Sequence, residues 1–406
     1  MSRLLRSTAV ETAVFIGLRL FTGLVSFALF ALIARWLAPA EAKGLVYFLF
    51  IAGFFMSALR LLCSQAAALH GPERRTEKLR RAMRGHGLVL WAAVLLLPLA
   101  AVVLVGPIPA AWGLPLAAFV IAFWGLDLDL LRAVVGRRSV VAPAAAVGAV
   151  AALACLAVFR TTDGALGALL LQWLPLAMMQ ARLAWRLRRR LRRALGAVWQ
   201  ARGQGLPGLM AIALFDGLII NAPFFLDART PAEVGLSVGV VTRIFVSSLM
   251  LMPLVMFWSN GRVLSRLGLR LGLLPAQVFW TISMGSGIVA GLGLAGCFAW
   301  LAGQPPRAVE LLAALVLLAG YCSFATVSRY RDAAGLASVG PVGRAGWPLL
   351  PFLAILVVCN LFAVAWAVTA PQPALTTAGV QTVSLLLGAG LLLAWPRRQK
   401  LPSEAL

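Results

Sequence analysis

The chain has 406 residues, of which 62% are hydrophobic and 12% are charged, and its mean hydropathy is +0.93. A soluble globular chain averages about 45–50% apolar and about 25% charged residues, so this composition excludes a water-soluble fold. The net charge of +23 would be typical of a nucleic-acid-binding surface on a soluble domain, but here the basic residues follow a membrane topology. We therefore expect no nucleic acid partner.

The hydrophobic residues are gathered in long runs. A helix needs about 20 apolar residues to cross the hydrocarbon layer of a bilayer. Twelve such runs occur, at residues 9–36, 44–69, 86–106, 112–134, 140–159, 164–185, 207–226, 232–258, 275–300, 308–328, 347–368 and 375–395. They do not alternate polar with apolar residues as the strands of a membrane barrel do. The sequence therefore predicts an all-α integral membrane protein with about twelve transmembrane helices.

The basic residues alternate between the gaps that separate these runs. Nearly all of them occupy the even gaps and the two ends of the chain, and the odd gaps hold only Arg35, Lys43, Arg160, Arg229 and Arg307. By the positive-inside rule, this asymmetry predicts that both the N-terminus and the C-terminus are cytoplasmic. One missed or invented span would disrupt the alternation, so the charge pattern also supports the helix count.

A repeated turn divides the chain into two halves. The longest basic gap, residues 187–206, separates the sixth and seventh runs and predicts two six-helix lobes, residues 1–195 and 196–406. The turns after the first and seventh runs, residues 39–45 and 231–236, share the pattern P-A-E, then one or two residues, then G-L. Pro39 and Pro231 end the preceding helix, and Gly44 and Gly235 are expected to permit a tight turn or hinge. Two copies of six helices predict parallel repeats, an arrangement known for alternating-access transporters.

Residues 34–45, with the sequence A-R-W-L-A-P-A-E-A-K-G-L, carry a family resemblance. The stretch resembles the R-x-L-G-P-x-E-x-G-L/I signature that closes the first helix in polysaccharide and oligosaccharide-lipid (Wzx-like) flippases of the multidrug/oligosaccharidyl-lipid/polysaccharide (MOP) exporter superfamily. The chain departs from that signature because Ala38 replaces the usual glycine and an extra residue precedes Gly44. The resemblance implies a MATE-like fold in the bacterial cytoplasmic (inner) membrane. It also implies a flippase that moves a polyprenyl-diphosphate-linked oligosaccharide to the outer leaflet by alternating access.

Six ionisable residues lie deep inside the apolar runs. Such residues cost about 2.5–3.5 kcal/mol each on insertion scales and usually face a bundle interior or a watery cavity. They are Arg19, Arg60, Asp127, Asp129, Asp216 and Arg243. The resemblance implies that the first, second, seventh and eighth helices line a central cavity, where several flippases carry arginines for a pyrophosphate. Because guanidinium stays charged and matches phosphate oxygens, we expect the three arginines to bind the substrate.

These residues also have other interpretations. The arginines would lock helices together if they paired with Asp127, Asp129 or Asp216, or would snorkel to the membrane surface. Asp216 is alternatively a proton or sodium site that drives exchange, and Asn221 and Pro223 would bend the same helix. Asp127 and Asp129 have the D-x-D spacing of many glycosyltransferase metal sites. Residues two apart in a helix point about 200° from one another, so we expect no metal site there.

Two other functions stay open. The first is a cation-coupled multidrug or small-molecule exporter of the same superfamily, whose cationic substrates would favour an acidic cavity. The second is a membrane glycosyltransferase or polymerase, but outer loops of about three to eight residues are too short for an active site and no P-loop occurs. We therefore expect a transporter and no enzyme, with no cofactor apart from a proton or sodium gradient. The expected partners are an anionic lipid-linked oligosaccharide and membrane lipids, with a polysaccharide polymerase or glycosyltransferases as further candidates.

Overall fold

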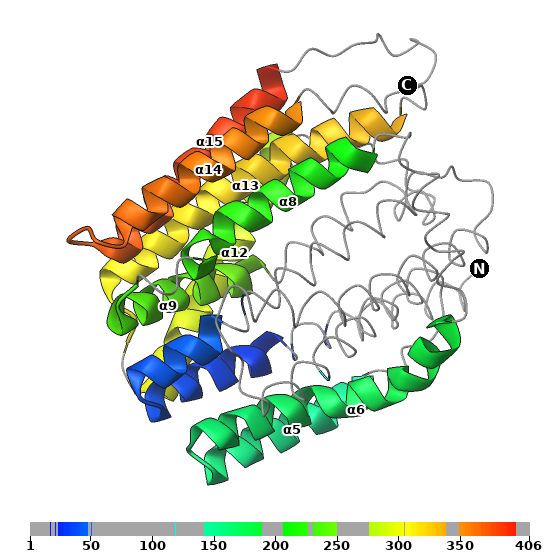
Figure 1. Ribbon diagram of the computed structural model, residues 1–406, viewed down its shortest axis with the longest axis vertical. Helices are drawn as coiled ribbons and strands as arrows, with labels where there is room; N and C mark the ends of the chain where they lie inside the picture. The colour runs from blue at the N-terminus through cyan, green and yellow to red at the C-terminus, as the bar shows by residue number, and fades with distance from the viewer. Residues whose placement is uncertain are drawn as a thin grey trace.

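In the computed structural model, the described residues are mainly helical, and Figure 1 shows how these helices are arranged. The structure describes residues 17, 21, 23–47, 50, 118, 142–188, 206–225, 230–249, 276–303, 305–337 and 349–394. The labelled helices are α5 (Ala142–Val158), α6 (Thr162–Arg188), α8 (Leu206–Phe225), α9 (Ala232–Ser248), α12 (Ala276–Ala302), α13 (Ala308–Ala337), α14 (Leu349–Ala367) and α15 (Pro373–Ala394). Two further helices cover Gly23–Trp36 and residues 39–47. These ranges contain no strand, so they confirm the all-α fold class.

The helices coincide with the predicted apolar runs. The eight labelled helices match the fifth to the twelfth runs, although α6 and α13 continue nine or fewer residues beyond their runs into the basic gaps. α9 ends at Ser248, ten residues before the predicted end of its run, and residues 250–258 lie outside the described residues. The first run and the start of the second correspond to Gly23–Trp36 and residues 39–47. Apart from Ala118, the third and fourth runs lie outside the described residues. The count of twelve helices therefore stays a prediction, as does the division into two six-helix lobes.

Three of the described helices are long and apolar enough to cross a membrane. They are α12, the Ala308–Ser328 part of α13, and α15. Large apolar side chains are exposed along them and along α14, including Val289, Trp300, Phe362 and Trp366. Exposed apolar surface of this extent is unfavourable in water but suits the hydrocarbon of a bilayer. We conclude that the chain is a multi-pass membrane protein.

The described helices form two groups. In the C-terminal half, α13 packs along α15, α8 packs on α14, and α9 packs on α12 and α13. Their shared core contains Phe215, Ile219, Phe245, Leu317 and Leu385. In the N-terminal half, α5 packs along α6. Because residues from helices far apart in the sequence fill each core, each group is held by tertiary packing of its apolar faces.

The helix Gly23–Trp36 joins the two groups. Val25, Leu29 and Ile33 lie four residues apart on one face and are buried in the core of α5 and α6. Phe27 and Phe30 lie on another face and belong to the core of the C-terminal half. Figure 1 shows this helix, in blue, between α5 and α6 on one side and α9 and α12 on the other.

Candidate functional site

The short connections between helices gather at one end of the bundle, toward the left of the view in Figure 1. They include residues 37–38, 159–161, 303, 305–307 and 368–372. Both copies of the repeated turn lie here, and each proline stands at the start of a helix: Pro39 is the first residue of helix 39–47, and Pro231 directly precedes α9. Gly44 and Gly235, which the sequence places in a turn or hinge, lie inside these helices. We therefore expect these two glycines to act in the packing between helices and not in a turn.

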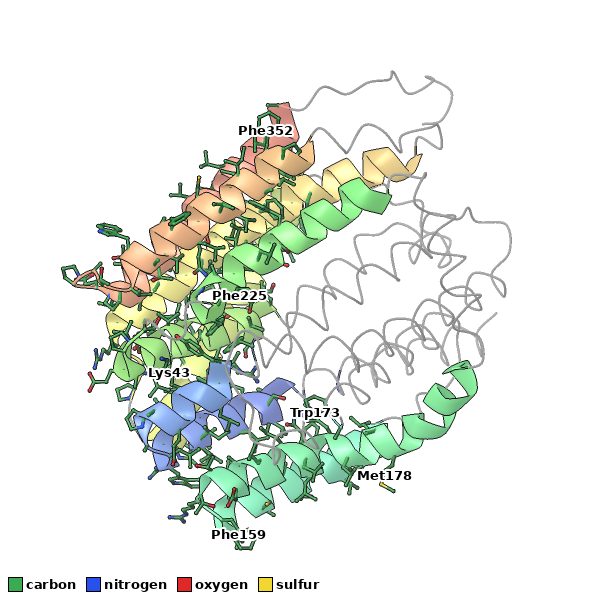
Figure 2. All side chains as sticks on the ribbon, viewed as in Figure 1. Lys43, Phe159, Trp173, Met178, Phe225 and Phe352 are labelled. Atoms are coloured by element: carbon green, nitrogen blue, oxygen red, sulfur yellow. The ribbon has the colours of Figure 1, made fainter. Side chains whose placement is uncertain are left out.

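The two copies of the turn contact each other across the two halves. Lys43 Nζ donates to the main-chain oxygen of Thr230 at 2.6 Å. A Cβ atom built on Gly235 would lie 3.0 Å from Lys43 Cδ and 3.0 Å from the Tyr47 hydroxyl oxygen. Figure 2 shows Lys43 where helix 39–47 meets α9.

A second glycine of α9 extends this contact. A Cβ atom on Gly239 would lie 3.2 Å from Val46 Cγ1. Gly235 and Gly239 have the G-x-x-x-G spacing that lets two membrane helices approach closely. We call the set Lys43, Val46, Tyr47, Thr230, Gly235 and Gly239 the turn-end contact.

Aromatic rings surround the turn-end contact. The Phe224 ring meets the Tyr47 ring edge-on, with centroids 4.8 Å apart, and stacks on the Phe50 ring at 4.4 Å. On the neighbouring helices, the Phe298 ring lies 6.1 Å from Phe27 and 6.2 Å from Phe30. Each of these pairs joins a residue of the N-terminal half to one of the C-terminal half, so the two halves meet through packed aromatic rings.

Arg35 makes a second polar bond between the halves. Its Nη1 donates to the main-chain oxygen of Leu301 at 3.0 Å, in the last turn of α12, and Gly303 continues the chain with a positive φ of 73°. A cation at the C-terminus of a helix is favourable because the last carbonyl groups lack helical donors. Arg35 and Lys43 are two of the basic residues in the odd gaps, and the structure places both on carbonyl oxygens of the other half.

Arg243 lies on the side of α9 that bears the two glycines. It follows Gly239 by one turn and lies about 16 Å from the start of α9 at Ala232, at 1.5 Å per residue. Gly235 and Gly239 are buried, Arg243 is half-buried, and Val246 is 39% exposed. The residues on this side of α9 are therefore less buried the further they lie from the turn-end contact. Among the described residues, the Arg243 Nε atom is buried and has no hydrogen-bond partner.

Asp216 lies at a similar distance from the turn end. It precedes Phe225, the last residue of α8, by nine positions, or about 14 Å. Its Oδ1 atom accepts a hydrogen bond from the Gly217 backbone N–H at 2.8 Å, and the Tyr321 side chain is a further hydrogen-bond partner. Within the described part of the chain, Asp216 and Arg243 form no ion pair with each other. The carboxylate and the guanidinium therefore lie in one layer of the bundle without neutralising each other.

The end of α8 that contains Pro223 is held from α15. Pro223 lies inside α8, and the Asn221 side chain donates to the Gly217 oxygen at 2.8 Å. The Gln381 side chain donates to two successive carbonyl oxygens of α8, those of Ile219 and Ile220. Phe224, which contacts the N-terminal half, comes directly after this proline.

The other predicted site residues, Arg19, Arg60, Asp127 and Asp129, lie outside the described residues. No group of three or more His, Cys, Asp or Glu side chains that could hold a metal occurs among the residues that the structure describes. Sequence reasoning missed Tyr321 and Gln381, although a glutamine inside the apolar run 375–395 was a visible signal. It also gave Lys43 no role, although Lys43 is in the region where the first copy of the motif is one residue longer.

The comparisons with known proteins do not assign the chain to a family. No protein-family model matches the chain, and the search of curated proteins gives no match. A search of solved structures finds similarity to one described as the inward-facing conformation of a multidrug resistance MATE family transporter of the MOP superfamily. The sequences are 12% identical, the match covers 94% of this chain and 97% of that chain, and the TM-score is 0.44. At this TM-score the family assignment stays the proposal that the sequence motif supports.

Proposed function

We propose that the chain is a flippase that moves a polyprenyl-diphosphate-linked oligosaccharide from the cytoplasmic to the outer leaflet of a bacterial cytoplasmic membrane. The movement would occur by alternating access of two lobes, residues 1–195 and 196–406. The observation that supports this function best is the place of Arg243. Arg243 lies one helical turn beyond Gly239, on the side of α9 whose residues become less buried away from the turn-end contact, and its buried Nε has no described partner.

A guanidinium in this place favours an anionic cargo. Burying an unpaired charged donor is costly, so a group of this kind is retained where a ligand supplies the missing acceptor. A diphosphate offers several acceptor oxygens that match the fork of the guanidinium. The sugar part of the cargo would be carried in the aqueous space and the polyprenyl chain in the lipid. Arg19 and Arg60 are proposed to complete the cationic site.

Transport in reconstituted vesicles tests this function. A fluorescent polyprenyl-diphosphate oligosaccharide would be placed in vesicles with the purified protein, and its exposure to a membrane-impermeant reagent would be followed with time. We expect Arg243→Ala to lower the transport rate at least about tenfold, because a charge-assisted hydrogen bond contributes about 1.5–3 kcal/mol. Arg243→Lys should retain part of the rate, since it keeps the charge but loses the fork.

Arg307→Ala is the matched control. Arg307 is an exposed arginine in the connection before α13, so its loss removes the same charge without changing the contact between the halves. We expect a transport rate within twofold of the natural protein. Full transport by Arg19→Ala, Arg60→Ala and Arg243→Ala, each shown to be inserted and folded, would contradict the proposed substrate site.

A cation-coupled exporter of the same superfamily is the second candidate. The observation that favours it is Asp216, whose described hydrogen-bond partners, Gly217 and Tyr321, are both uncharged. An acidic group with neutral partners is suited to bind a proton or a sodium ion. Gradient-driven export of a cationic dye, with no movement of the lipid-linked sugar, would favour this function over the flippase.

A further inference from the structure

The two copies of the repeated turn meet at equivalent positions. Lys43 and Gly235 each follow the proline of their own copy by four residues, and a Cβ atom built on Gly235 would lie 3.0 Å from Lys43 Cδ across the halves. In an interface related by a two-fold axis, residues near the axis face their own equivalents. The contact between Lys43 and Gly235 therefore marks the place where an axis relating the two halves would cross the turn end.

We infer that the turn-end contact is the outer gate of the transporter, and that Lys43 is its latch. The inference rests on the proposed function, since only a transporter with two access states needs a gate between its halves. It also places the turn end at the outer membrane surface, as the positive-inside pattern predicts. In this gate, Lys43 of the first copy holds the Thr230 carbonyl group next to the second copy.

The first copy is fastened firmly to its own half. The Glu41 carboxylate accepts a hydrogen bond from the Thr162 hydroxyl at the start of α6, at 2.9 Å. Leu37, Ala42 and Leu45 are buried in the core shared with α5 and α6. Helix 39–47 would therefore move with the N-terminal half as one body, and the contact with α9 is the place where separation would occur.

The polar bonds of the gate are of a kind that can be broken and remade. Lys43 and Arg35 both donate to main-chain oxygens across the halves. A charged hydrogen bond of this kind contributes about 1.5–3 kcal/mol. At the membrane surface, both cations would find water or lipid phosphates after opening. These hydrogen bonds thus stabilise the closed state, and they can break when the two halves separate.

Packed aromatic rings next to Lys43 close the gate between the two halves. Phe224 stacks on Phe50 and meets Tyr47, and it stands just after Pro223 at the end of α8. Further from the turn end, Arg243 is half-buried and Val246 is exposed. This side of α9 is therefore more covered at the gate than at Val246.

A cysteine pair across the gate tests the inference. Because Gly239 Cβ would lie 3.2 Å from the γ position of Val46, the pair Val46→Cys and Gly239→Cys has the geometry for a disulfide, in a chain whose native cysteines are replaced. The matched control is Gly320→Cys with Thr382→Cys, which joins α13 to α15 inside one half, where the corresponding distance is 2.8 Å. Mild oxidation should cross-link both pairs.

The two cross-links should affect transport differently. We expect the gate cross-link to lower transport of the lipid-linked sugar at least tenfold, with recovery after reduction, and the control cross-link to leave it within twofold. A gate pair that cross-links and still transports at the control rate would overturn the inference. So would a gate pair that does not cross-link, because the contact would then be absent in the membrane.

A second readout does not depend on the substrate. In the same background, Val246→Cys places a thiol below the gate, and a membrane-impermeant thiol reagent is added from either side. With the gate cross-linked, this thiol should react from the cytoplasmic side only, and Lys43→Ala with Tyr47→Ala should make it react from the outer side. Equal labelling from both sides in every variant, or none at all, would overturn the gate. Absence of sugar transport in all variants, with the expected labelling, would instead overturn the proposed function.

Discussion

The side-chain amide of Gln381 in α15 donates to the main-chain oxygen of Ile219 in α8, at 3.0 Å. In a regular helix that oxygen would accept from the N–H four residues later, but residue 223 is a proline and has no N–H. The same amide nitrogen lies 2.9 Å from the Ile220 oxygen. Gln381 thus replaces the donor that Pro223 removes, and it fixes the segment of α8 that carries Phe224.

This relationship predicts that Gln381 and Pro223 are coupled. Gln381→Leu should lower the free energy of unfolding by about 1–3 kcal/mol, because the Ile219 oxygen loses its donor inside the bundle. In a Pro223→Ala background, the restored N–H serves that oxygen, so Gln381→Leu should cost clearly less. A double-mutant cycle, with unfolding followed by detergent titration, measures the difference. Equal costs in both backgrounds would show that Gln381 does not compensate for the proline.

Two glycines of α15 should respond in opposite ways to substitution by alanine. A Cβ atom on Gly388 would lie 2.5 Å from Phe215 Cε1 and 3.3 Å from Phe324 Cε2, whereas Gly390 is exposed and has nothing within 4 Å. We expect Gly388→Ala to destabilise the protein by about 1–3 kcal/mol through overpacking. Gly390→Ala should be neutral or slightly stabilising, because alanine is the better helix former by about 0.5–1 kcal/mol.

The apparent melting temperature of the purified variants checks this pair. Gly390→Ala serves as the internal control, since it makes the same chemical change in the same helix two residues away. Similar melting temperatures for both variants would mean that α8 and α13 do not pack on α15 at Gly388 as described.

A buried amide between α14 and α15 gives a third test. Asn360 is 2% exposed, its Nδ2 atom donates to Ser384 Oγ at 2.9 Å, and its Oδ1 atom has no partner among the described residues. Ser384→Ala should therefore destabilise, by about 1–3 kcal/mol, because it leaves a second polar atom of Asn360 unpaired. Asn360→Leu removes the unpaired Oδ1 together with the amide nitrogen, keeps the same branching and number of side-chain heavy atoms, and should cost less.

Unfolding measurements on the two single variants and the double variant check this order. If Asn360→Leu proves the more damaging change, Oδ1 has a partner that the described residues do not include. In that case Asn360 would belong to a larger polar network inside the C-terminal half.

Helix positions could be predicted from the sequence because lipid imposes one strong rule. Each span needs an unbroken apolar run, and prolines and basic clusters separate the runs, so α5, α8, α12, α14 and α15 begin and end close to their predicted bounds. The roles of Gly44 and Gly235 could not be predicted in the same way. A glycine after a proline is typical of a turn, but the apolar pattern cannot tell which helix approaches it. Only the tertiary structure shows that Gly235 lies close to the Lys43 side chain.

The candidate site could be predicted only in part, for a related reason. Charge in an apolar run identifies Asp216 and Arg243 as unusual. Counting residues along the runs predicts that Arg243 lies nearer the outer third of its helix than Asp216 does, whereas the structure has them at similar distances from the turn end, about 14 Å for Asp216 and about 16 Å for Arg243. The side-chain partner of Asp216 cannot be predicted in this way, because Tyr321 comes from α13, more than a hundred positions from Asp216 in the sequence. Gln381 was missed because a single amide in an apolar run carries no pattern, although its hydrogen bonds decide how α8 ends.

Asp216 gives the last prediction, which separates ion coupling from a structural role. Asp216→Asn keeps the shape of the side chain and an oxygen that accepts from the Gly217 N–H, but it can neither take up a proton nor balance a bound cation. If Asp216 couples transport to an ion, the variant should still move substrate down its gradient, within about twofold of the natural protein. It should not respond to an imposed proton or sodium gradient. Vesicles with and without each gradient provide the measurement, and Tyr321→Phe, which removes only the neighbouring hydroxyl, should keep the response. A variant at position 216 that is driven by the gradient as strongly as the natural protein would limit Asp216 to holding α8 against α13.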